Sequence, residues 1–163
     1  MNHEMPRTLK VVTVWLLLGT LLFVAVQWWQ HRALQARFTA GEDVIEIRRG
    51  PDGHYHWPGR VNEREVDFLI DTGATGTAIP ASLAKALRLE SVGTVESSTA
   101  NGPVTGQIVV ADIALRGGLV VRRLRVAALP GLEDRPLLGM DLLGRLHWQQ
   151  TDGVLKIDLR SLR

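Results

Sequence analysis

The chain has 163 residues, enough for one domain of ordinary size, and with 45% hydrophobic and 22% charged residues it has the composition of a globular protein. It contains no cysteine, which excludes disulfide frameworks, thiol nucleophiles and cysteine-based zinc sites. The net charge of +2 comes entirely from residues 1–42, since residues 43–163 hold equal numbers of basic and acidic side chains. We therefore expect no nucleic-acid partner, because the globular part has no net field to attract phosphate.

The first predicted element is a membrane anchor. Residues 11–29 carry no charged side chain, and as a helix they would extend about 28 Å, close to the thickness of a hydrocarbon core. Trp28 and Trp29 lie where an interfacial aromatic belt would fall. A cleaved signal peptide is the alternative, but its apolar core would be shorter. We predict a short tail over residues 1–10, a transmembrane helix over 11–29 and a juxtamembrane linker over 30–42.

The remaining residues, 43–163, have the pattern of an all-β domain with one or two short helices. Short apolar or alternating runs follow one another, separated by turn residues such as Asn101-Gly102 and Asp152-Gly153. The expected strands and hairpins cover residues 44–47, 54–57, 60–70, 97–100, 104–110, 113–115, 119–126, 147–150 and 154–159. Helices are expected over 81–89, directly after Pro80, and over 141–146.

The most informative stretch for chemistry is Phe68-Leu69-Ile70-Asp71-Thr72-Gly73-Ala74-Thr75. Asp71 directly follows an apolar strand, where burying a carboxylate is costly unless donors are directed at it. Thr72 supplies a hydroxyl, and Gly73 allows a sharp turn and a close approach of another segment. An ordinary turn after a strand is the simpler interpretation of Asp-Thr-Gly taken alone.

Three stretches in order resemble the retropepsin-type aspartic proteases, most closely the single-lobed, membrane-anchored bacterial members. Residues 59–75 resemble the opening of that domain, and Thr99-Ala100-Asn101-Gly102 resembles the flap, a hairpin that closes over substrate. Pro136-Leu137-Leu138-Gly139, followed by Met140 to Leu143, resembles the apolar segment and short helix that pack beside the active-site loop. The resemblance covers residues 43–163 and implies a retropepsin-like closed β barrel or sandwich.

The resemblance also implies site residues. Asp71 is expected to be catalytic, and Thr72, Gly73, Ala74 and Thr75 are expected to support it. Flap and substrate-binding roles are expected for Ala100, Asn101 and Gly102. Leu137, Leu138 and Gly139 are expected to pack against the active-site loop.

The implied reaction is hydrolysis of peptide bonds by a water that two carboxylates activate, one ionised and one protonated. The chain holds one Asp-Thr-Gly, and Asp141 lacks the residues that would make a second copy. The inference is a homodimer in which Asp71 of each chain contributes one carboxylate. Neither metal nor organic cofactor is implied. The family suggests a bacterial inner membrane protein whose protease domain is periplasmic and acts on peptides or proteins.

Two other functions are open on the residues alone. A non-catalytic interaction module of the same fold would bind peptides by strand addition without cutting them. A metal-dependent hydrolase would use His54 and His56, which would share one face of a strand, although no third ligand is evident from the sequence.

Overall fold

The computed structural model describes residues 7–33, 37–39, 43–99, 102–132 and 134–160, and it divides into two compact units, residues 1–35 and 36–163. The first unit consists of helix α1 (Arg7–Ala33), in which the side chains from Val12 to Gln27 are exposed. Among the side chains described, no helix combines the length and apolar character needed to cross a membrane, so the structure does not support the predicted transmembrane helix over residues 11–29.

The second unit begins at Ala36, earlier than the predicted domain start at Asp43. Strand β1 (Arg37–Thr39) lies within the segment predicted as a linker and pairs antiparallel with β8. The three residues of β1 are too few for a sequence pattern to predict a strand. Its pairing comes from the edge that β8 offers, which is a tertiary effect.

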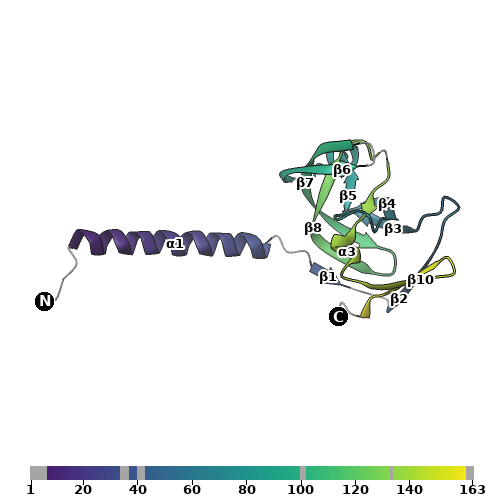
Figure 1. Ribbon diagram of the computed structural model, residues 1–163, viewed down its shortest axis with the longest axis horizontal. Coiled ribbons are helices and arrows are strands. Elements are labelled where there is room, and N and C mark those ends of the chain that lie inside the picture. Colours follow the sequence, from purple (N-terminus) through teal and green to yellow (C-terminus); the bar gives the residue numbers. More distant parts are fainter. Residues whose placement is uncertain (1–6, 34–36, 40–42, 100–101, 133, 161–163) are drawn as a thin grey trace. The chain divides into compact units, whose positions relative to one another are not determined.

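The second unit is rich in strands, as predicted (Figure 1). In chain order its elements are β1 (Arg37–Thr39), β2 (Val44–Arg48), β3 (His56–Val61), β4 (Arg64–Ile70), β5 (Ala78–Pro80), α2 (Ala81–Ala86), β6 (Ser91–Thr99), β7 (Gly102–Leu115), β8 (Leu119–Leu129), β9 (Leu137–Leu138), α3 (Met140–Leu143), β10 (His147–Thr151) and β11 (Val154–Asp158).

The larger sheet closes into a barrel. Its strand order is β1-β8-β5-β9-β4-β3-β7-β6, and an additional pairing of β7 with β8 joins the two ends of the inner six strands. Strands β1 and β6 are attached to this ring on β8 and β7. The predicted all-β fold with a closed barrel and few short helices is therefore confirmed.

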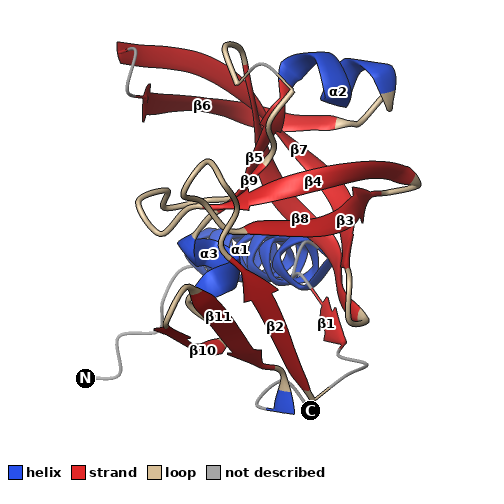
Figure 2. Ribbon diagram, turned by 90° about the vertical axis from the view of Figure 1, so that its right-hand side faces the viewer, coloured by secondary structure: helices blue, strands red, loops and turns tan. Residues whose placement is uncertain are grey.

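The barrel interior is filled by large apolar side chains that are fully buried, among them Trp57, Phe68, Ile79, Ile113 and Leu138. They come from five different strands, so the core fixes the strands relative to one another. A smaller sheet of order β10-β11-β2 lies beside the barrel (Figure 2). Ile45, Ile47, Leu155 and Ile157 of this sheet belong to the same core.

Several predicted elements differ in extent from the observed ones. The helix expected over 81–89 ends at Ala86, and Arg88 beyond it takes a positive φ of 51°. The strands expected over 104–110 and 113–115 form one long strand, β7, with an irregularity in its pairing to β8 between Ala111 and Ile113. A bulge of this kind bends a strand and increases its local twist without ending it.

Candidate functional site

The candidate site lies on the loop that joins β4 to β5. Phe68, near the end of β4, is fully buried in the core. Asp71 is the first residue after this strand, which ends at Ile70. Strand β9 lies between β4 and β5, parallel to β4 and antiparallel to β5. The loop over residues 71–77 must therefore pass across the carboxyl end of β9 to reach β5.

Asp71 is half-buried and tied to the loop at both its backbone and its side chain. Its backbone N–H donates to the Leu138 carbonyl (3.0 Å), which continues the pairing of β4 with β9 by one residue. One of its carboxylate oxygens, Oδ1, accepts the N–H of Gly73 (2.8 Å), and its carbonyl accepts the N–H of Ala74 (3.3 Å). The loop thus directs a backbone donor at the carboxylate.

The residues after Asp71 form the exposed part of the loop. Thr72, Gly73 and Thr75 are exposed, and Ala74 is half-buried. A Cβ atom at Gly73 would lie 3.2 Å from Asp71 Oδ1, so any other residue there would crowd the carboxylate.

The segment predicted to pack beside this loop does contact it. Leu138 is fully buried and accepts the Asp71 N–H, while Leu137 is half-buried and pairs with Leu69 and Ala78. Gly139 approaches the loop closely: a Cβ atom on it would lie 2.4 Å from the carbonyl carbon and oxygen of Gly76. Only a glycine leaves room for this contact.

Two site residues that sequence reasoning missed are Thr77 and Asp141. Thr77 is 1% exposed, and its N–H and hydroxyl both donate to Asp141 Oδ1, at 2.9 and 2.8 Å. From the sequence, Asp141 was considered only as a second catalytic carboxylate, and it was set aside because no Thr-Gly follows it. The available signal was its position in the first turn of a predicted helix, where an acidic side chain accepts backbone donors.

Of the predicted flap residues, the structure describes Gly102, whereas Ala100 and Asn101 lie outside the described residues. Gly102 begins β7 with a positive φ of 105°, and its carbonyl accepts the Thr99 hydroxyl (2.7 Å). Strands β6 and β7 form a long hairpin that reaches beyond the barrel at the upper left of Figure 2. Within the described part of the chain, no hydrogen bond joins Gly102 to the loop over 71–77.

The histidines considered as metal ligands lie elsewhere. His56 places Nε2 2.8 Å from Asp52 Oδ2 and Nδ1 3.1 Å from Asp67 Oδ2, and the hydrogen bond from His56 lowers the pKa of Asp52. Strand β3 begins only at His56, so His54 does not share a strand face with it. Among the described residues, no group of three or more histidine and carboxylate side chains is arranged so that it could hold a metal ion.

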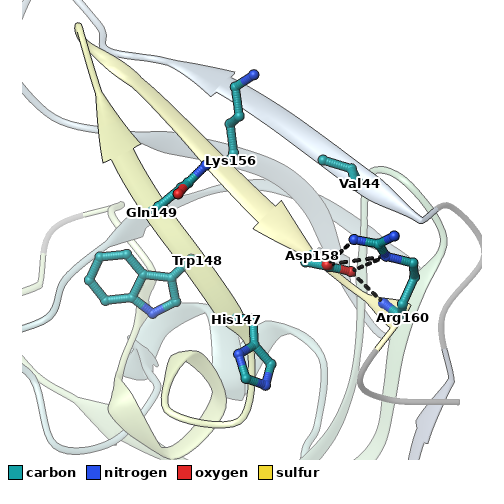
Figure 3. A pocket seen from close by; sticks show the side chains of 7 residues that line it. All are labelled: Val44, His147, Trp148, Gln149, Lys156, Asp158 and Arg160. Carbon is teal, nitrogen blue, oxygen red and sulfur yellow. Dashed lines mark hydrogen bonds and ion pairs between the residues drawn. The ribbon is translucent and has the colours of Figure 1, made fainter.

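A surface pocket of about 480 Å³ lies on the sheet of β2, β10 and β11 (Figure 3). Its charged groups are paired within the chain, because Arg160 binds Asp158 and Lys156 binds Glu46. The residues that line it are Val44, His147, Trp148, Gln149, Lys156, Asp158 and Arg160. None belongs to the loop over 71–77, so this pocket is separate from the candidate site.

A family model and a solved structure agree in what they match. A family model described as "gag-polyprotein putative aspartyl protease" matches residues 57–145. The crystal structure of a retropepsin-like aspartic protease from Rickettsia conorii matches with a TM-score of 0.54 and 22% sequence identity, covering 76% of this chain and 93% of that one. At that identity the match supports the fold. No match is found among curated proteins.

Proposed function

Because the chain belongs to the gag-polyprotein putative aspartyl protease family, we propose that it is an aspartic endopeptidase whose catalytic carboxylate is Asp71. The observation that carries the proposal is the placement of this carboxylate. Asp71 lies at the end of β4, on a loop that is hydrogen-bonded to β9. The residue is half-buried, and one of its carboxylate oxygens accepts a backbone N–H. Such a group can hold a water and accept its proton.

Peptide hydrolysis by this chemistry needs a second carboxylate. One group must accept a proton from the attacking water, while another delivers a proton to the leaving amine, and two carboxylates in close contact share one proton between them. Asp141 does not serve, because its Oδ1 already accepts three hydrogen bonds beneath the loop, from the N–H and hydroxyl of Thr77 and the N–H of Leu142.

We infer that the second carboxylate is Asp71 of another copy of the chain, in a symmetric homodimer. The exposed side of the loop supports this, since Thr72 and Gly73 beside Asp71 are open to a partner. In such a pair the Thr72 hydroxyl would bond across the two-fold axis and fix the two loops. The peptide substrate would lie between the loops and the β6–β7 hairpins.

Cleavage of a mixed peptide library by the full chain tests the proposal. Asp71→Asn removes the proton acceptor while preserving size, so we expect the rate to fall by at least about 100-fold. The matched control is Asp152→Asn in the β10–β11 turn, because Asp152 is exposed at a positive φ of 50° that asparagine tolerates. Equal cleavage by wild type and Asp71→Asn would contradict the proposal.

The same experiment separates the protease from the interaction module. Peptides that bind the wild-type chain and Asp71→Asn alike, and are recovered uncut from both, would favour a binding function of this fold.

We further propose that residues 11–29 anchor the chain in a bacterial inner membrane with residues 43–163 in the periplasm. The uncharged sequence of that stretch supports the proposal. The chain should stay with membranes during alkaline carbonate extraction, and added protease should digest it in spheroplasts but not in intact cells. Release by carbonate would contradict the anchor, and protection in spheroplasts would contradict the orientation.

A further inference from the structure

The network beneath the active-site loop joins two parts of the chain that are 64 residues apart in sequence. Thr77 stands at the end of the loop, and its side chain is almost completely buried. Its hydroxyl donates to Asp141 Oδ1 (2.8 Å) and accepts the N–H of Gly139 (3.3 Å). Both hydrogen-bonding roles of the hydroxyl are therefore used, one toward β9 and one toward α3.

The hydrogen bonds that the Asp141 side chain accepts from Thr77 and Leu142 all meet at one oxygen. Oδ1 accepts the N–H and hydroxyl of Thr77 and the N–H of Leu142 (2.9 Å), while the backbone N–H of Asp141 donates to the Thr75 carbonyl (3.1 Å). An ionised carboxylate only accepts hydrogen bonds, and an amide oxygen can accept the same three. The position therefore requires an acceptor, and a charge is not essential to it.

Consecutive residues from Leu138 to Asp141 hold the loop along its whole length. Leu138 accepts the N–H of Asp71, Gly139 packs against Gly76, Met140 donates to Ala74 (2.9 Å) and Asp141 holds Thr75 and Thr77. These four consecutive residues therefore fix the backbone of the loop by hydrogen bonds and packing. Thr77 and Asp141 fasten the end of the loop opposite to Asp71.

We propose that Thr77 and Asp141 are positioning residues that fix the loop and so set the direction of the Asp71 carboxylate. The inference rests on the proposed function. A displacement of about 1 Å at a reacting group can cost about 100-fold in rate. Loosening the far end of a short loop therefore lowers turnover even where the chain stays folded. Thr77 is almost completely buried and Asp141 directs its carboxylate at Thr77, so we expect neither residue to contact the substrate, and the loss should fall on kcat and not on KM.

The activity test uses four variants of the full chain. Thr77→Val keeps the shape but removes the hydroxyl, and Asp141→Ala removes the acceptor; we expect each to lower kcat by about 10- to 100-fold with KM unchanged. Thr77→Ser and Asp141→Asn preserve the donor and the acceptor, so each should recover most of the wild-type kcat. Thr151→Val, at an exposed threonine on β10, is the control for the loss of a hydroxyl.

A second measurement reports the loop without relying on catalysis. Hydrogen exchange, followed by mass spectrometry on peptides spanning residues 71–77 and 138–143, should accelerate in Thr77→Val and Asp141→Ala and stay slow in Thr77→Ser and Asp141→Asn. The Met140 and Asp141 amides carry the expected change, because their acceptors are the carbonyls of Ala74 and Thr75.

The outcomes separate this inference from the proposed function. Wild-type chain that cuts no peptide, combined with faster exchange in Thr77→Val, would overturn the protease and support the positioning role. A folded Thr77→Val that keeps at least half of the wild-type kcat would overturn the positioning role. If Thr77→Val fails to fold, Asp141→Asn decides, since a loss of more than about 10-fold in that variant would contradict an acceptor role.

Discussion

At the scale of single residues, the contact between Gly139 and Gly76 decides how closely the segment after β9 approaches the loop over residues 71–77. A Cβ atom at position 139 would meet backbone atoms of Gly76 at 2.4 Å, and backbone cannot rotate away as a side chain can. The glycine is thus required by packing, with an ordinary extended backbone of φ −96°.

Gly139→Ala should therefore destabilise the chain by about 1–3 kcal/mol, the usual cost of forcing extra volume into a packed site. It should also lower kcat, because the loop must move to make room. Urea unfolding of the full chain measures the stability. Gly93→Ala on β6 is the control, since a Cβ there would meet only Ile108 Cδ1 at 3.9 Å and should change stability by less than about 0.5 kcal/mol. Equal effects of the two variants would contradict the packing argument.

At the scale of elements, the end of β11 is secured by an ion pair. The guanidinium and backbone N–H of Arg160 both bind Asp158, and these hydrogen bonds lower the pKa of Asp158 to about 2 from the ordinary 3.8. A carboxyl whose pKa is lower in the folded chain than in the unfolded chain stabilises the fold above its unfolded pKa, and that contribution is lost as the pH falls toward the folded value.

The stability difference between wild type and Asp158→Asn should therefore be constant from neutral pH down to about pH 5, and should shrink toward zero between about pH 4 and pH 2. Urea midpoints measured across that range check the prediction. Arg160→Gln removes the same pair from the other side, so its deficit should disappear over the same interval. A deficit that persists unchanged at pH 2 would show that the pair is not its cause.

The features of the fold that could be predicted from the sequence are those that depend on a local pattern, such as strand ends and turns. The apolar run Phe68-Leu69-Ile70 ending in Asp71 placed the carboxylate at a strand end, and Asp152-Gly153 placed the turn between β10 and β11. Strand β9 is only two residues long, and its insertion between β4 and β5 joins segments far apart in sequence. The Thr77–Asp141 link is equally non-local, so periodicity and turn chemistry gave no access to either.

At the scale of the whole molecule, the barrel carries its candidate catalytic group on an exposed loop, and the proposed chemistry needs two such loops. Mixing the wild-type chain with Asp71→Asn tests this directly, because a mixed pair would hold one ionisable carboxylate. With a fourfold excess of the variant and random pairing, the cleavage rate should fall about fivefold relative to wild type alone.

A fourfold excess of Asp152→Asn is the control, and it should not lower the rate contributed by the wild-type chain. An unchanged rate with excess Asp71→Asn, under conditions where tagged copies of the two chains are shown to exchange, would contradict a shared pair of carboxylates.

The late position of β9 in the chain has a consequence for biosynthesis. Asp71 is translated long before Leu138 and Asp141, yet its loop is held by both. Until residues 137–143 have left the ribosome, the barrel lacks the strand on which that loop rests. In the protease proposed above, the catalytic site would therefore assemble only after residues 137–143 have been synthesised.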